Sequence, residues 1–324
     1  MDRRRARIFA LAGLLLLVAP CARAVLVSSH VFSNHKGGCG KTTILFHVAC
    51  KYAMDHPNEK LLLGGDKGAV GKQGVSSVAT MCSTTQLLGK AASVSSAESG
   101  PEPGRVSSFL GLLPARVLKR DAGAGGGKLV LEEQVLEAHR FNEAIPENLL
   151  LAPGGSGPQT KYADQQIAAI AATLRKALEE SDGKWKLLVD TDGDQGFSDY
   201  TKIAHAVCDR CIIPLKTNVN DFSNRCIPML EARAPHSAPP ANELCQSRLR
   251  GEARSRVQMI VWNEIDIYKN APSSVSGLIT PPKATQGVIN MLNTLVAEVA
   301  ATYPDLFYNA APDERADALA LQAL

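Results

Sequence analysis

The sequence has few cysteines, almost no net charge in its body and no long apolar run after its first residues. Eight cysteines in 324 residues are too few for a fold held together by disulfides. No segment after residue 27 is apolar for long enough to cross a bilayer, which excludes an integral membrane domain there. An apolar fraction of 45% with 21% charged residues is ordinary for a globular chain and excludes global disorder.

The formal net charge of +3 is concentrated at the N-terminus. Residues 1–24 hold five of the 35 basic residues and one of the 32 acidic residues, which leaves 30 against 31 in the rest of the chain. A body this close to neutral gives no general case for nucleic-acid binding.

The first 24 residues have the pattern of a signal or targeting segment. Four arginines between positions 3 and 7 precede an apolar stretch over residues 8–19, which is short for a bilayer span. Ala22-Arg23-Ala24 then fits a small-x-small cleavage site. We therefore expect organelle import or secretory entry, with a mature chain that begins at Val25. The alternatives are an uncleaved anchor, or a wrongly assigned start codon and a cytoplasmic protein.

Short apolar segments alternate with helical periodicity along the remaining chain. This alternation predicts an α/β fold, a doubly wound, mostly parallel sheet flanked by helices. We expect one domain over residues 25–310, a flexible insertion near 92–128 that is rich in Ser, Gly, Pro and Ala, and a tail over 311–324. The strands are expected at 25–33, 61–63, 148–151, 185–190, 210–215 and 257–262, and the helices at 42–54, 162–180 and 284–301.

The segment between the first expected strand and the first expected helix has the composition of a phosphate-binding loop. It contains Gly37, Gly38, Cys39, Gly40, Lys41, Thr42 and Thr43. Its glycines let the backbone approach phosphates and turn N–H groups inward, and the helix N-terminus adds a positive dipole end. Lys41 can reach the β- and γ-phosphates, and the Thr42 hydroxyl can ligate Mg²⁺. We therefore expect residues 37–43 to bind a nucleotide.

Residues 36–43, Lys-Gly-Gly-Cys-Gly-Lys-Thr-Thr, resemble the deviant Walker A motif of the ParA/MinD ATPases. The preceding Asn34-His35 is more similar to the ParA/Soj branch. The resemblance implies a P-loop NTPase fold, Mg²⁺ and ATP as ligands, a homodimer formed on ATP binding, and slow hydrolysis. It also implies that Lys36 touches the partner protomer's phosphates; the alternative is a solvated loop lysine.

The family's second strand ends in Asp-x-Asp-Pro-Gln-Gly, and here residues 61–68 are Leu-Leu-Leu-Gly-Gly-Asp-Lys-Gly. Asp66 falls on the second aspartate, which in the family orients the attacking water, so the resemblance implies that role. Gly64 replaces the first aspartate, and the Pro-Gln pair is missing. These departures weaken the case for hydrolysis more than the case for binding. The alternative for Asp66 is a turn residue between glycines.

Two later strands resemble other parts of the family's site. Residues 185–190 resemble a Walker B strand, which implies that Asp190 holds Mg²⁺ together with Thr42. Asp192 and Asp194 follow it, either in a switch that responds to the γ-phosphate or as solvated turn residues. Residues 261–266 resemble the strand that ends in an adenine-recognising Asn, which implies that role for Asn263, since an amide both donates and accepts.

A Cys-x-x-Cys pair and a basic run leave further possibilities. Cys208 and Cys211 are spaced like half a zinc site, a redox pair or part of an iron–sulfur site. Because the pair runs into an expected strand and no second pair follows, we favour buried structural thiols. Four arginines at positions 248, 250, 254 and 256 would suit the nonspecific DNA binding of ParA relatives. In a neutral body, we favour a solvated loop.

Together these patterns predict a ParA-like ATPase that binds Mg²⁺ and ATP and serves, as in partitioning, as a dimerisation switch for an unidentified protein partner or cargo. Its catalytic residues would be Lys36, Lys41 and Asp66. One alternative is a nucleotide-binding module without turnover, favoured by Gly64 and the missing Pro-Gln. The other is an iron–sulfur electron-transfer or assembly protein on the same fold.

Overall fold

The computed structural model describes part of the chain. The described residues are 25–34, 37–65, 131, 135–140, 142–152, 163–191, 199–226, 254–263, 283–302 and 306–308. The expected targeting segment, the insertion near 92–128 and the C-terminal tail lie outside these residues. So do His35, Lys36, Asp66, Asp192 and Asp194, together with Arg248 and Arg250 of the basic run.

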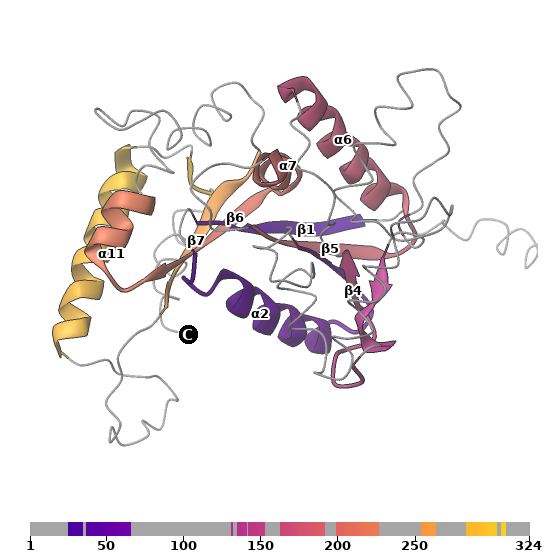
Figure 1. Ribbon diagram of the computed structural model, residues 1–324, viewed down its shortest axis with the longest axis horizontal. Coiled ribbons are helices and arrows are strands. Elements are labelled where there is room, and N and C mark those ends of the chain that lie inside the picture. The colour runs from indigo at the N-terminus through magenta and orange to yellow at the C-terminus, as the bar shows by residue number, and fades with distance from the viewer. Residues whose placement is uncertain are drawn as a thin grey trace, which may run out of the picture.

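Strands and helices alternate along the described residues, as the sequence predicts (Figure 1). In chain order the main elements are β1 (Val25–Phe32), α2 (Lys41–Asp55), β2 (Lys60–Gly64), β3 (Leu136–Glu137), β4 (Leu149–Ala152), α6 (Asp164–Glu180), β5 (Lys184–Asp190), α7 (Asp199–Val207), β6 (Arg210–Lys216), β7 (Arg256–Asn263) and α11 (Lys283–Thr302). Shorter helical turns lie at Ala138–Arg140, Val219–Asp221 and Phe222–Cys226.

The strands form one sheet in the order β3-β4-β2-β5-β1-β6-β7. Every neighbouring pair is parallel except β3 with β4, which is antiparallel. The expected doubly wound, mostly parallel sheet is therefore confirmed. The chain leaves β1 for β2 on one side and later adds β6 and β7 on the other, so the order reverses at β1. Crevices at the carboxyl ends of strands beside such a reversal are where open α/β sheets bind ligands.

Helices cover both faces of the sheet and enclose two hydrophobic clusters. Helix α2 lies on one face, and α6 and α7 lie on the other (Figure 1). The α2 side packs Leu45 and Ala49 against Phe32 and Leu188. The larger cluster on the opposite side includes residues of α6, α7 and α11. Successive strand residues point to opposite faces, which is why Val31 and Phe32 belong to different clusters.

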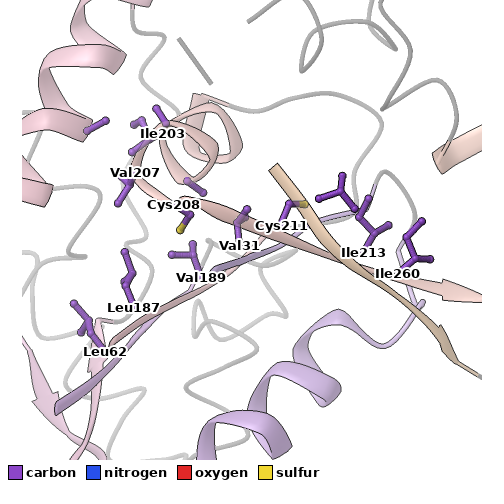
Figure 2. Close-up of a cluster of buried hydrophobic side chains, with 14 of the residues drawn as sticks. Val31, Leu62, Leu187, Val189, Ile203, Val207, Cys208, Cys211, Ile213 and Ile260 are labelled. Atoms are coloured by element: carbon purple, nitrogen blue, oxygen red, sulfur yellow. The ribbon is translucent and has the colours of Figure 1, made fainter. Parts of the chain in front are cut away.

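Cys208 and Cys211 lie in the larger cluster, close to Val31 (Figure 2). Both thiols are fully buried, and neither forms a disulfide. Burial raises the pKa of Cys208 well above its ordinary value, with the Asp209 charge and Cys211 adding to it. Buried thiols in apolar surroundings are usually inert, and the burial that the sequence analysis favours for this pair is confirmed.

Helix α7 is the main element that the sequence analysis did not predict. Its nine residues include Thr201 and His205, both of which are buried, beside Ile203 and Val207. Polar residues at inward positions hide the helical period of an amphipathic segment. The two-residue strand β3 is too short to give any pattern.

A half-buried polar cluster joins the middle of β1 to the residue just before β6. Ser29 Oγ donates to Asp209 Oδ2 at 2.9 Å, and the Asp209 N–H donates back to Ser29 Oγ at 2.9 Å. Arg175 and Arg254 pair with the same carboxylate at 3.2 and 2.6 Å. Burial alone would raise the pKa of Asp209, but the two arginines and Ser29 hold it below its usual value. Arg254 of the basic run thus has a structural ion pair.

His30 on β1 makes stability depend on pH. Its Nε2 lies 2.8 Å from Gln258 Oε1, and the side chain is buried. Burial, then the nearby charges of Lys186 and Arg210, lowers the pKa of His30 from 6.5 to about 4, against smaller opposing effects of Gln258 and Asp209. The folded protein therefore holds a neutral imidazole under conditions in which the unfolded chain takes up a proton.

We expect the free energy of unfolding to fall as the pH drops from 6.5 to about 4, because the unfolded state then binds the additional proton. The His30 contribution across this range is roughly 3 kcal/mol. Denaturant unfolding at a series of pH values measures it. The variant His30→Gln keeps a polar partner for Gln258 but does not titrate, so its decline should be shallower. Equal declines in the two proteins would contradict this assignment.

Candidate functional site

The loop that follows β1 starts from a fixed position. Asn34 Nδ2 donates to the carbonyl of Pro214 at 2.7 Å, and the Ser33 N–H donates to the carbonyl of Ile212 at 3.0 Å. Ser33 Oγ lies 3.0 Å from Nε2 of His205. These contacts tie the start of the loop to β6 on one side and to α7 on the other.

The glycine turn itself depends on two left-handed residues. Gly38 has φ +70°, and Gly40, the residue just before α2, has φ +86°. A Cβ atom at Gly40 would lie 2.2 Å from Asn263 Nδ2, whereas one at Gly37 or Gly38 would meet nothing within 4 Å. Position 40 therefore requires glycine for its backbone angle, and a side chain there would also push the Asn263 amide aside.

Asn263, at the end of β7, holds this turn in place. Its Nδ2 donates to the carbonyl of Cys39 at 3.0 Å. Thr217, just after β6, donates to the Asn263 carbonyl through its N–H at 3.2 Å and its Oγ1 at 3.0 Å. The structure thus brings Asn263 to the loop, as the sequence resemblance implies, but its amide donor binds the loop's own carbonyl. Recognition of adenine stays a prediction.

Lys41 and Cys39 face one another within the loop. Lys41 opens α2, its side chain is buried, and its Nζ lies 3.8 Å from the Cys39 sulfur. The thiol is buried as well. The ammonium group therefore lies against the glycine turn, at the N-terminal end of α2, where the helix dipole already favours an anion.

Thr42 and Asp190 meet at the carboxyl edge of the sheet. Thr42 Oγ1 donates to Asp190 Oδ2 at 2.6 Å across 148 positions of sequence. Asp190 ends β5, pairs in register with Phe32 at the end of β1, and is 5% exposed. Thr191 Oγ1 donates to the Phe32 carbonyl at 2.8 Å and fixes the end of β5. A hydroxyl and a carboxylate oxygen therefore lie side by side at the N-terminus of α2.

These two oxygens fit a magnesium ion. Mg²⁺ prefers oxygen ligands and is usually held by one or two protein groups together with substrate phosphates. Among the described residues, no group of three or more His, Cys, Asp or Glu side chains is placed to hold a metal ion. A hydroxyl and a single carboxylate are donors of the kind that hold Mg²⁺ together with phosphate oxygens.

The structure gathers Gly37 to Thr43, Asp190 and Asn263 at one edge of the sheet, with Thr43 exposed on α2.

Gly64 ends β2, on the far side of β5. A Cβ there would lie 3.5 Å from Val189 and 3.7 Å from the Tyr200 hydroxyl, both ordinary contacts. Sequence reasoning missed Ser33, Thr217 and His205 as parts of this edge. Ser33 and Thr217 show only as polar residues at the ends of apolar segments, and His205 only as a polar residue inside one.

Comparison with solved structures identifies the fold. The apo form of McdA from Cyanothece aligns with a TM-score of 0.51 and 14% identity, over 85% of this chain and 82% of that one. An ATP complex of a single-residue variant of Cyanothece McdA aligns with a TM-score of 0.50 and 15% identity, over 85% and 79%.

The chain has the fold of these McdA structures. At 14 to 15% identity, this likeness shows the fold alone. No protein-family model and no curated protein sequence matches the chain. Among the described helices, none combines the length and the apolar character of a membrane span.

The three loop glycines should differ in their tolerance of alanine. We expect Gly37→Ala to be nearly neutral and Gly38→Ala to cost about 1 kcal/mol of left-handed strain. Gly40→Ala should cost the most, because its Cβ also collides with Asn263. Denaturant unfolding of the three variants measures the order. A Gly40→Ala protein as stable as Gly37→Ala would show that the turn does not have this geometry.

Proposed function

We propose that the protein binds Mg²⁺ and ATP at the loop of residues 37–43 and works as a ParA-like, nucleotide-dependent dimerisation switch with slow hydrolysis. The contact between Thr42 and Asp190 is the observation that carries this proposal. It places two magnesium-type ligands beside a glycine turn at a helix N-terminus, at the switch point of a P-loop fold. The McdA variant with this fold was solved as an ATP complex, which supports the choice of nucleotide.

Several groups of the chain would contribute to phosphate binding. The N–H groups of the glycine turn and the α2 dipole would attract the phosphates. The Lys41 side chain would move from the Cys39 sulfur to contact the β- and γ-phosphates, since its Nζ already lies at the glycine turn. The deviant Walker A arrangement adds Lys36, which would act on the phosphates of a second copy of the chain.

Magnesium would be held by Thr42 and Asp190. When bound, the ion would neutralise charge on the phosphates and orient them. In the structure the Thr42 hydroxyl donates to the Asp190 carboxylate. That hydrogen bond keeps both oxygens at the edge of the sheet where the ion would bind.

Hydrolysis is the less supported half of the proposal. Asp66, which the sequence places two positions after the last residue of β2, would position the attacking water. The chain has Gly64 where the family has its first aspartate, and this favours the alternative of a switch that binds ATP without turning it over. Measured phosphate release that disappears in Asp66→Ala would exclude that alternative.

The described structure argues against Cys208 and Cys211 as ligands in the iron–sulfur alternative. A cluster shared across a dimer needs thiolates that reach the subunit surface. Cys208 and Cys211 are both fully buried between α7 and the sheet (Figure 2). Their apolar surroundings disfavour the thiolate that an iron ion requires.

Removal of the Lys41 side chain should strongly weaken ATP binding. We expect Lys41→Ala to weaken ATP affinity by at least about a hundredfold, since two charge-assisted contacts to phosphate are lost. Isothermal titration calorimetry with and without Mg²⁺ measures it. Thr42→Ala should remove most of the magnesium dependence. The control is Lys51→Ala on the exposed side of α2, where Lys51 pairs with Asp55 one turn further along the helix. Unchanged affinity in Lys41→Ala would overturn the assignment of the loop.

ATP should convert the chain from Val25 onward from monomer to dimer. Size-exclusion chromatography coupled to light scattering, with ATP, ADP or no nucleotide, measures this, and phosphate release is followed in parallel. We expect Lys36→Ala to bind ATP but not to dimerise, and Asp66→Ala to dimerise without turnover. A wild-type chain that stays monomeric with saturating ATP would contradict the switch.

A further inference from the structure

Helix α7 carries a fully buried histidine whose ring is bound on both sides. His205 Nε2 lies 3.0 Å from Ser33 Oγ, and Nδ1 lies 2.6 Å from Ser255 Oγ. All three residues are 2% exposed or less. A neutral imidazole offers one donor and one acceptor, and each serine hydroxyl can take either role. Both ring nitrogens are therefore satisfied without a buried charge, and the ring has one fixed orientation.

This hydrogen-bonded network of polar side chains lies inside the hydrophobic core. The neighbours of His205 on α7 include Ile203, Ala204 and Val207, which belong to the larger hydrophobic cluster. Polar groups in such a place destabilise the fold unless every hydrogen bond is made. The backbone carbonyl of His205 is used as well, because it accepts from the N–H groups of Arg254 and Ser255 at 3.0 and 3.1 Å.

The position of this histidine links two parts of the candidate site. Ser33 is the residue directly after β1, at the start of the phosphate loop. Helix α7 begins at Asp199, nine positions after Asp190, the candidate magnesium ligand. At the start of the same helix, the Tyr200 hydroxyl lies within 3.7 Å of the Cβ position of Gly64. One helix therefore touches the ends of β1 and β2, on either side of β5.

We propose that His205 is a positioning residue of the nucleotide site: through Ser33 it fixes the start of the phosphate loop relative to α7. Displacement of α7 would then displace the loop, and occupation of the loop would stabilise α7 in its place. The consequence for ATP affinity rests on the proposed function, whereas the effect on the loop itself does not.

The same strand offers a matched control. Ser29 lies on β1 four residues before Ser33 and therefore on the same face of the sheet. It is also fully buried, and it exchanges two hydrogen bonds of 2.9 Å with Asp209. Replacement of either serine by alanine removes one buried hydroxyl from the same strand. Only Ser33 leads into the phosphate loop.

Hydrogen exchange of the nucleotide-free full chain tests the effect on the loop. The amide of Ile44 donates to the Gly40 carbonyl at 2.9 Å, so its exchange reports the opening of the glycine turn. We expect Ser33→Ala to accelerate exchange in the peptide that covers residues 38–46 about fivefold, the loss of one net hydrogen bond. Ser29→Ala should leave that peptide unchanged. Equal acceleration in both variants, or none in Ser33→Ala, would overturn the proposal.

A double-mutant cycle then assigns the effect to the bond with His205. His205→Gln and Ser33→Ala should each accelerate exchange, and the double variant should not exceed the larger of the two single effects, because the contact between His205 and Ser33 is lost in both. Additive effects would show that His205 does not act through Ser33. ATP affinity of Ser33→Ala should fall about fivefold, the same loss of one net hydrogen bond, with Ser29→Ala unchanged. If the wild-type chain binds no ATP while the exchange pattern holds, the proposed function fails and the positioning role stands.

Discussion

The hydrogen bond between Thr42 and Asp190 depends on the sheet having β5 beside β1. The two residues are far apart in the chain, and only the parallel pairing of these strands brings the end of one to the helix that follows the other. Phe32 and Asp190 pair in register, and Thr191 returns to the Phe32 carbonyl. The candidate site therefore depends more on the order of the strands in the sheet than on the glycine loop.

The loop is fixed at several points, each by a different element. Asn34 is bound to β6 and Ser33 to α7 at its start, while Asn263 from β7 holds the Cys39 carbonyl at the turn. Such contacts matter because a phosphate site is made mostly of backbone N–H groups, whose direction is set by the path of the chain. A loop that is already ordered loses less conformational entropy when a ligand arrives, so more of the contact energy appears as affinity.

The sequence contains enough to predict the fold and the centre of the site. Apolar segments with Leu61 to Leu63 or Trp185 to Asp190 are buried strands whose pattern is local, and the glycine loop is a local motif as well. The partners of that loop could not be predicted, because Ser33, Thr217 and His205 acquire their roles only through strand order and helix packing. Asn263 was placed at the site by resemblance, yet its contact with the Cys39 carbonyl depends on the left-handed turn at Gly40.

The amide of Asn263 has a consequence for how any base would be selected. Its Nδ2 is already engaged by the Cys39 carbonyl and packs over Gly40. A ligand that needs this particular N–H group has to displace a hydrogen-bond acceptor that belongs to the protein. For such a ligand the Cys39 carbonyl is a competitor within the protein, and its affinity is reduced by the free energy of the hydrogen bond that it replaces. A base that uses the amide oxygen or the second N–H group would escape this competition, so discrimination between bases would vary with the stability of the empty loop.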